Sequence, residues 1–244
     1  MLFGLLGKNI SYSFSKKFFT QKFNTEKLNH KFENIDLHKI DDLVDYLNDN
    51  IEKLQGFSVT IPYKEEIFKY LYEVDDEAKE IGAVNCVKII NKSYLKGFNT
   101  DTYGFENALK PLLKKHNEKA LILGTGGASK AVVFSLKKLK IDYKLVSRTP
   151  NNDQYSYEEL TKDIINNYTL IINTTPLGTK GKFEDKCANI PYKHLTKKHY
   201  LFDLNYNPDI TLFLKKGKEK GTTIKNGLEM LELQAEKAWE IWNE

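Results

Sequence analysis

The chain has 244 residues, enough for a large core and for one or two domains. Its formal net charge is +4, but the lysines are scattered among acidic residues along the whole chain, which argues against a nucleic-acid-binding surface. No apolar run approaches the roughly 20 residues that a bilayer span needs, and Cys86 and Cys187 form neither a disulfide framework nor a metal motif. We therefore expect a reduced cytoplasmic protein that binds no metal, membrane or nucleic acid.

Strand-like and helix-like segments alternate almost throughout, which predicts an α/β fold with mostly parallel sheets. The apolar start of the chain is expected to form the first strand and not a signal peptide. The strands expected in the first part of the chain cover residues 2–6, 31–36, 57–60 and 84–90. The helices expected there cover residues 16–23, 40–47 and 64–71.

Two hydroxyls, those of Ser13 and Ser15, stand one residue apart between the first strand and the first helix. In an extended loop they point the same way, and at a helix N-terminus they could bind a carboxylate or the hydroxyls of a substrate. The other interpretation is that one of them simply caps the helix. The residues alone leave both interpretations open.

Three further polar positions stand at the ends of expected elements. Lys64 is expected in the first turn of a helix, where a cation is unfavourable beside the helix dipole. Asn85 interrupts an apolar strand. Asp101, with itself or Thr100 as N-cap, begins a long helix that is expected to run to about Lys115. Each of these residues also has an ordinary explanation as a surface lysine, a turn residue or a cap.

The segment Lys119–Pro150 has the order of a dinucleotide-binding βαβ unit, with a glycine turn between an apolar run and a helical pattern. Gly124 allows the tight turn, and Gly126 lets the backbone approach a pyrophosphate. The helix that begins near Gly127 presents free N–H groups to that anion. This pattern predicts a bound dinucleotide.

Arg148 predicts which dinucleotide is bound. It is the only arginine among 37 basic residues, and it stands just past the second strand of this unit, where the adenosine ribose would lie. An acid there would hydrogen-bond the 2′-hydroxyl of NAD, whereas a guanidinium suits the 2′-phosphate of NADP because its planar fork holds a phosphate bidentately. The predicted cofactor is NADP. Later strands are expected at residues 170–173 and 200–204, and an amphipathic helix at 228–243.

Taken in order, these segments resemble the shikimate dehydrogenase family over essentially the whole chain. The first motifs that carry the resemblance are Ser13-Phe14-Ser15, Val59-Thr60-Ile61-Pro62-Tyr63-Lys64, Gly82-Ala83-Val84-Asn85 and Asn99-Thr100-Asp101-Thr102-Tyr103-Gly104. The later ones are Gly124-Thr125-Gly126-Gly127-Ala128, Ser147-Arg148-Thr149, Asn173-Thr174-Thr175-Pro176-Leu177-Gly178 and Gly227-Leu228-Glu229-Met230-Leu231-Glu232-Leu233-Gln234.

The resemblance implies reversible, NADPH-dependent reduction of 3-dehydroshikimate to shikimate, a step of aromatic amino-acid biosynthesis. It implies that Lys64 and Asp101 are the catalytic pair. The substrate contacts that it implies are Ser13, Ser15, Thr60, Asn85, Asp101, Gln234 and, from the nucleotide side, Tyr206. The cofactor contacts are Gly124, Gly126, Gly127, Ala128, Ser147, Arg148, Thr149, Thr174, Leu204 and Gly227.

The resemblance also implies a domain plan: a substrate domain of residues 1–101, a Rossmann-type NADP domain of residues 102–226, and a last helix, 227–244, that returns to the substrate domain. The match has departures. The family's serine loop reads His-Ser-x-Ser-Pro-x-x-His-Asn, whereas here Tyr12 and Phe19 stand at its two His positions and Lys16 stands at its Pro. In the nucleotide motif, Ser147 replaces the Asn that usually stands beside the arginine. A quinate/shikimate dehydrogenase of broader specificity and a non-catalytic NADP-binding regulator remain alternatives. So do a monomer and a homodimer.

Overall fold

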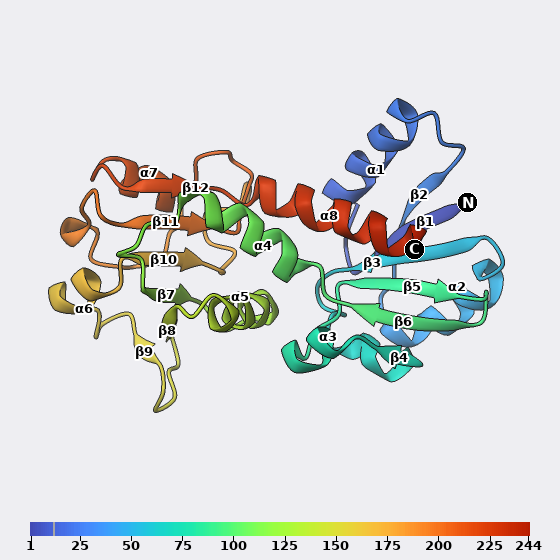
Figure 1. The fold of residues 1–244 in the computed structure, drawn as a ribbon, viewed down its shortest axis with the longest axis horizontal. Helices are drawn as coiled ribbons and strands as arrows, with labels where there is room; N and C mark the ends of the chain where they lie inside the picture. Colours follow the sequence, from blue (N-terminus) through green and yellow to red (C-terminus); the bar gives the residue numbers. More distant parts are fainter. Residues whose placement is uncertain (12) are drawn as a thin grey trace. The chain divides into compact units, whose positions relative to one another are not determined.

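The computed structural model describes residues 1–11 and 13–244, and over these residues the chain forms two compact α/β units, each with a six-stranded sheet (Figure 1). Unit 1 consists of Met1–Asp101 and Gln234–Glu244, and unit 2 of Thr102–Leu233. The α/β fold class predicted from the alternation of segments is confirmed.

In unit 1 the strands are β1 Leu2–Gly7, β2 Lys31–Asp36, β3 Leu54–Val59, β4 Glu73–Val74, β5 Cys86–Ile90 and β6 Tyr94–Phe98. Its helices are α1 Phe14–Thr25, α2 Leu43–Asn50, α3 Asp76–Ile81, the 3₁₀ helices η1 Ile40–Asp42 and η2 Glu66–Tyr70, and the last part of α8 Leu228–Asn243. The strand order is β2-β1-β3-β5-β6-β4. β1 is parallel to β2 and β3, whereas β5 is antiparallel to β3 and β6, so this sheet is mixed.

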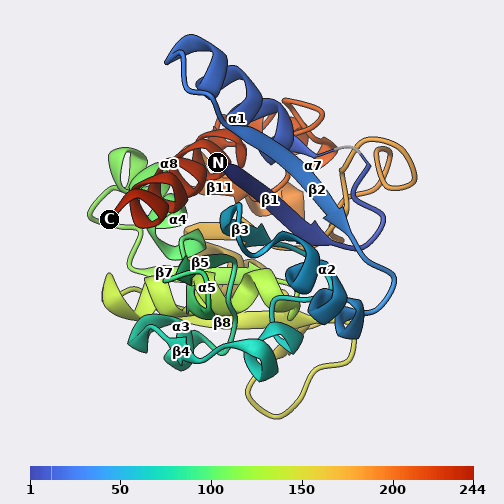
Figure 2. The ribbon, with the colours of Figure 1, turned by 90° about the vertical axis from the view of Figure 1, so that its right-hand side faces the viewer.

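Apolar residues cover both faces of this sheet. α1 and α8 lie on one side of β1 and α2 on the other (Figure 2). On the first face the end of α8 packs through Trp242, which stacks on Phe3 with ring centroids 5.2 Å apart. The indole of Trp242 also donates to the Val87 carbonyl at 3.0 Å. The apolar face of α8 thus holds the end of this helix in the core of unit 1.

In unit 2 the strands are β7 Lys119–Leu123, β8 Asp142–Ser147, β9 Tyr155–Ser156, β10 Leu170–Asn173, β11 Tyr200–Asp203 and β12 Thr223–Lys225. Its helices are most of α4 Asp101–Leu109, then α5 Gly127–Lys138, α6 Lys162–Asn167, α7 Leu212–Lys218, the 3₁₀ helices η3 Lys110–Leu112 and η4 Tyr192–His194, and the start of α8. The strand order is β12-β11-β10-β7-β8-β9 and the paired strands are parallel. The order reverses between β7 and β10, and in doubly wound sheets ligands bind outside the carboxyl ends of the strands at such a point.

The prediction of a helix over residues 64–71 is wrong. Residues 61–65 form turns, and only the 3₁₀ helix η2 follows. The reason is a long-range hydrogen bond: the carbonyl of Lys64 accepts from the backbone of Val84 at 2.8 Å, so it is engaged outside the helical ladder, and Phe68 bonds back to Glu65 instead. Lys64 is therefore not a first-turn residue opposed by a helix dipole.

The long helix expected to reach about Lys115 is also shorter than predicted. α4 ends at Leu109 and passes into η3. Pro111 explains the end, because proline lacks the N–H that an α-helix interior needs and its ring clashes with the preceding turn. In the part of the chain that the structure describes, no helix has the length and apolar character to cross a membrane.

The packing of Trp242 generates a stability prediction. Trp242→Ala should lower the free energy of unfolding by about 3–5 kcal/mol, because it leaves a large cavity and removes the indole hydrogen bond to the Val87 carbonyl. Trp242→Phe should cost less, because it keeps a ring against Phe3. Urea unfolding followed by circular dichroism measures both variants. A midpoint unchanged in Trp242→Ala would show that the end of α8 does not stabilise unit 1.

Candidate functional site

The centre of unit 1 is an ion pair between Lys64 and Asp101. Lys64 Nζ lies 2.6 Å from Asp101 Oδ2, and the two side chains are only 19% and 13% exposed. Asp101 is the first residue of α4, and the partial positive charge of a helix N-terminus stabilises a carboxylate there. An ammonium has three donors, so this bond leaves Lys64 with N–H groups for another acceptor.

A buried amide fixes the carboxylate of this pair. Asn85 Nδ2 donates to Asp101 Oδ1 at 2.8 Å and to Gln234 Oε1, on α8, at 3.3 Å. Asn85 Oδ1 accepts from the backbone of Thr100 at 2.7 Å. We call these five residues the Lys64 cluster. It brings together four predicted site residues from separate segments, namely Lys64, Asn85, Asp101 and Gln234.

Two residues beside the predicted ones were not expected to be functional. Thr100 is buried, and its hydroxyl lies 3.1 Å from Asn85 Nδ2. Asn99 Oδ1 accepts from the Asp101 backbone at 3.0 Å, and its Nδ2 donates to the Ala83 carbonyl at 2.8 Å. The available signal was the Asn two residues before Asp101, because such a side chain commonly bonds the backbone two residues on.

The serine loop has a different arrangement. Ser13 Oγ accepts from the Lys16 backbone at 3.1 Å and caps α1. Ser15 is buried and Thr60 is half-buried. Within residues 1–11 and 13–244 neither hydroxyl has a hydrogen-bond partner, and neither they nor Ser13 form a hydrogen bond with the Lys64 cluster. Tyr12 lies outside the described residues. Unpaired, sheltered hydroxyls are suited to a polar ligand.

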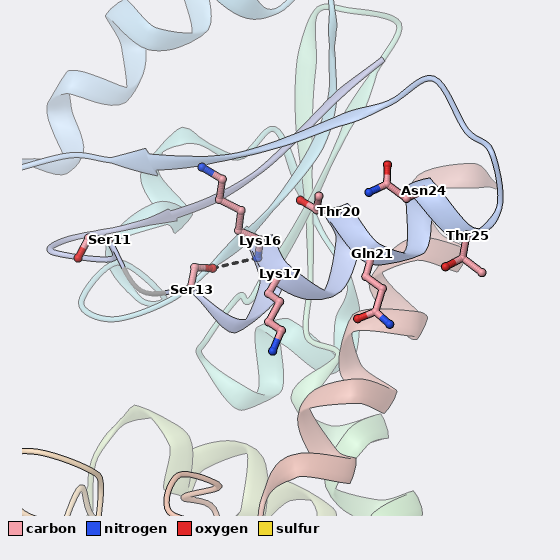
Figure 3. A pocket seen from close by; sticks show the side chains of 8 residues that line it. All are labelled: Ser11, Ser13, Lys16, Lys17, Thr20, Gln21, Asn24 and Thr25. Atoms are coloured by element: carbon pink, nitrogen blue, oxygen red, sulfur yellow. Dashed lines mark hydrogen bonds between the residues drawn. The ribbon is translucent and has the colours of Figure 1, made fainter.

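The start of this loop is held by Asp36, which the sequence did not single out. Its carboxylate accepts from the backbones of Asn9 and Ile10 at 2.8 and 3.1 Å. A pocket runs along the polar face of α1 (Figure 3). Its lining residues are Ser11, Ser13, Lys16, Lys17, Thr20, Gln21, Asn24 and Thr25. Because Ser13 alone of the predicted site residues lines it, we assign the chemistry to the Lys64 cluster and not to this pocket.

In unit 2 the glycine turn after β7 forms an open anion cradle. Gly124 has φ +107°, which requires glycine, and a Cβ on Gly126 would meet nothing within 4 Å. α5 begins at Gly127, has no side-chain cap and carries no acidic residue in its first turn. Ser129, at the place of the usual third glycine, is buried, and its hydroxyl donates to the Gly126 carbonyl at 2.7 Å. The N–H groups of α5 and the helix dipole therefore favour a phosphate at this turn.

The loops that follow β7 and β10 meet at the switch point of the sheet. Thr174 Oγ1 donates to the Leu123 carbonyl at 2.9 Å. At the edge of the sheet, Arg148 is exposed and takes part in no hydrogen bond or ion pair with the residues that the structure describes. Ser147 Oγ accepts from the Thr149 backbone at 3.2 Å. The cradle and the unpaired guanidinium fit a dinucleotide that carries an extra phosphate.

The loop that carries Tyr206 is organised by a buried carboxylate that the sequence did not reveal. Asp203 ends β11 and accepts from Thr211 Oγ1 at 2.5 Å, Asn173 Nδ2 at 2.9 Å and the Asn205 backbone at 3.0 Å. Asn205 Nδ2 also donates to the Thr175 carbonyl at 3.0 Å, which joins the loops after β10 and β11. Burial raises the pKa of Asp203 to about 6, although these hydrogen bonds favour its charged form.

Leu204 and Gly227 lie together beside this loop. The Gly227 backbone donates to the Asn205 carbonyl at 3.0 Å. A Cβ on Gly227 would collide with the Leu204 carbonyl, so only glycine fits there. Tyr206 is half-buried, and burial raises its pKa. Among the residues described, no group of three or more His, Cys, Asp or Glu could hold a metal ion.

Known proteins match this chain over its length. The model of the shikimate dehydrogenase substrate binding domain matches residues 5–87. A shikimate dehydrogenase (NADP(+)) of Clostridium botulinum strain Hall is 38% identical over 250 residues, which are 98% of this chain and 95% of that protein.

Solved structures agree with these matches. One is a chorismate mutase/shikimate 5-dehydrogenase fusion protein from Clostridium acetobutylicum, with 34% identity, TM-score 0.87, and coverage of 99% of this chain and 90% of that one. Another is a shikimate 5-dehydrogenase from Thermus thermophilus in complex with NADP(H) and shikimate, with 29% identity, TM-score 0.87, and coverage of 99% and 93%. The fold and the two residue groups define the class of two-domain, dinucleotide-dependent α/β oxidoreductases. Within it, the chain belongs to the shikimate dehydrogenase family.

The buried Asp203 predicts a pH effect on stability. Its folded pKa of about 6 lies above its ordinary value of 3.8, so the folded state holds the proton more tightly than the unfolded state. Its contribution to stability therefore falls as the pH rises from about 4 to about 6, by up to about 3 kcal/mol. Asp203→Asn cannot titrate, and between pH 4 and pH 7 its unfolding free energy should rise relative to that of the wild type by up to this amount. Urea unfolding at both pH values measures the unfolding free energies of the wild type and the variant. Asp153→Asn, an exposed control, should follow the wild type, and the same behaviour in Asp203→Asn would contradict the raised pKa.

Proposed function

We propose that this chain catalyses the reversible, NADP-dependent interconversion of 3-dehydroshikimate and shikimate. The observation that carries the proposal is the Lys64–Asp101 ion pair, held in a buried polar cluster in a member of this family. Residues 1–101 with 227–244 are the proposed substrate domain, and residues 102–226 are the proposed NADP domain. The match of residues 5–87 to a substrate binding domain supports the first assignment.

The substrate contacts follow from what the side chains offer. The substrate carries a carboxylate and ring hydroxyls, which need donors and acceptors in a sheltered place. Ser15 and Thr60 supply hydroxyls without partners in the described structure. Ser13, although it caps α1, keeps its own O–H as a donor. Asn85 and Gln234 supply amides, and we assign Tyr206 to the substrate as well.

NADPH, when bound, supplies the hydride that reduces the ring ketone. The oxygen of the ketone then gains negative charge, which the Lys64 ammonium stabilises with its remaining N–H groups. The Lys64–Asp101 pair supplies the proton that completes the alcohol, and in the reverse direction it takes this proton back. Asp101 orients the Lys64 ammonium through the ion pair at 2.6 Å. Asn85 in turn orients Asp101.

The proposed dinucleotide site consists of two features of unit 2, the glycine turn at the start of α5 and Arg148. Gly124, Gly126, Gly127 and Ala128 at the start of α5 are assigned to the pyrophosphate, since the helix N-terminus there is free of side-chain caps. Arg148, flanked by Ser147 and Thr149, is assigned to the 2′-phosphate. Thr174, Leu204 and Gly227 complete the proposed cofactor contacts, and the first of them already touches the turn after β7.

The direct test of the activity follows the absorbance of NADPH during incubation of the purified protein with 3-dehydroshikimate. We expect oxidation of NADPH, little oxidation of NADH, and little reaction with 3-dehydroquinate. Comparable turnover of 3-dehydroquinate would show a broader quinate/shikimate specificity. Binding of NADPH without turnover of either substrate would contradict the enzymatic assignment and favour a non-catalytic NADP-binding protein.

Cofactor choice is tested through Arg148. Arg148→Ala should weaken NADPH binding by about 1.5–3 kcal/mol, the range for hydrogen bonds to charged groups, and leave NADH binding nearly unchanged. Titration of protein fluorescence with each nucleotide measures both affinities. Equal losses for the two nucleotides would refute the role in binding the 2′-phosphate.

The catalytic pair is tested by Lys64→Ala and Asp101→Asn. Lys64→Ala should lower kcat by at least about a hundredfold, the contribution of a lost general acid, with NADPH affinity preserved. Asp101→Asn keeps the shape but removes the charge opposite Lys64, so kcat should fall as well. Because the two residues act as a unit, the double variant should be little worse than the poorer single variant.

The matched control is Lys69→Ala, which removes an exposed lysine also paired with an aspartate, Asp41 at 2.9 Å. Its steady-state kinetics should equal those of the wild type. Near-normal turnover in Lys64→Ala would refute the mechanism even if the cofactor assignment held. Additive losses in the Lys64/Asp101 double variant would assign the two residues independent roles.

A further inference from the structure

We propose that Tyr157 is a second contact for the 2′-phosphate of the cofactor, with its hydroxyl donating to a phosphate oxygen beside the Arg148 guanidinium. This inference rests on the NADP assignment made above. It extends that assignment from one residue to a pair on neighbouring strands, and it names a residue outside the motifs of the family resemblance.

The register of the sheet brings the two residues together. β8 and β9 are parallel, and their paired residues are Val146 with Tyr155 and Ser147 with Ser156 (Figure 1). Arg148 and Tyr157 each follow the last pair, so they lie opposite one another just beyond the carboxyl ends of the two strands. Doubly wound sheets bind their ligands outside the carboxyl ends of the strands.

The ring of Tyr157 is anchored by packing, and the charge of Arg148 acts on its phenol. Tyr157 is half-buried and packs against an apolar cluster that includes Val146, Leu160 and Ile165. Burial raises the pKa of its phenol, and the positive charge of Arg148 opposes that rise. At neutral pH the phenol is protonated and can donate. A ring held in place by packing loses little freedom when a ligand binds.

The chemistry of a phosphate monoester explains why a second donor is useful. A guanidinium fork binds two phosphate oxygens at once, which leaves the third terminal oxygen for another donor. Arg148 is the sole arginine of the chain. Thr149, Pro150, Asn151, Asn152 and Asp153, which follow it, are exposed and contain no lysine, so the segment brings no second cation. A hydroxyl on the neighbouring strand supplies the missing donor without another positive charge.

The test compares two ligands that differ only in the phosphate in question. Isothermal titration calorimetry of the whole chain with 2′-phospho-ADP-ribose and with ADP-ribose measures how much the 2′-phosphate contributes to the binding free energy. Tyr157→Phe keeps the ring and removes the hydroxyl. We expect it to weaken 2′-phospho-ADP-ribose by roughly tenfold, about 1.4 kcal/mol, and to leave ADP-ribose unchanged.

Tyr155→Phe is the matched control, because Tyr155 stands two residues earlier in the chain and its ring packs edge-on against Tyr168, with ring centroids 6.3 Å apart. It should bind both ligands like the wild type. Unchanged affinity of Tyr157→Phe for 2′-phospho-ADP-ribose would overturn the inference, and so would an equal loss for both ligands. If the wild-type protein itself does not distinguish the two ligands, the NADP assignment fails, a result that is separate from the behaviour of Tyr157→Phe.

Discussion

The arrangement of unit 1 follows from the cost of sheltering two opposite charges. Removing a lysine and a carboxylate from water is expensive unless geometry and further hydrogen bonds compensate. Lys64 and Asp101 meet at 2.6 Å, and the second carboxylate oxygen of Asp101 accepts from Asn85. Asn85 is fixed in turn by Thr100. The ion pair is therefore held by an amide just before β5, by the start of α4 and, through Gln234, by α8 from the far end of the chain.

In unit 2, by contrast, two positive groups lack a neutralising partner among the described residues. The start of α5 has neither a cap nor an acidic residue, and Arg148 has no ion-pair partner in the described chain. Positive potential that is not neutralised within the protein attracts an anionic ligand. The buried Asp203 in the same unit accepts several hydrogen bonds and thereby organises the loop after β11.

The differences between the expected and observed elements have a common origin in long-range contacts. The apolar spacing of Tyr63 and Ile67 is typical of a helix, and one helical bond between them does form, at 3.0 Å. The Lys64 carbonyl nevertheless bonds to Val84, a partner that no local pattern reveals. Asp203 was missed for a similar reason, because its hydrogen-bond partners lie on three separate segments. α4 is the exception, since the proline that explains its end at Leu109, Pro111, was visible in the sequence.

The α/β class, the glycine turn and the polar residues of the proposed site could be predicted from the sequence. These features depend on short-range properties: apolar periodicity, the backbone freedom of glycine, and motifs only a few residues long. The tertiary structure was needed to show that Lys64, Asn85, Asp101 and Gln234 share hydrogen bonds. It also shows that Ser13 caps a helix, that the Ser15 hydroxyl has no hydrogen-bond partner among the described residues, and that Arg148 and Tyr157 each follow the last residue pair of two neighbouring strands. Such partnerships depend on strand register and on buried polar groups finding donors and acceptors far along the chain, and no local pattern encodes that pairing.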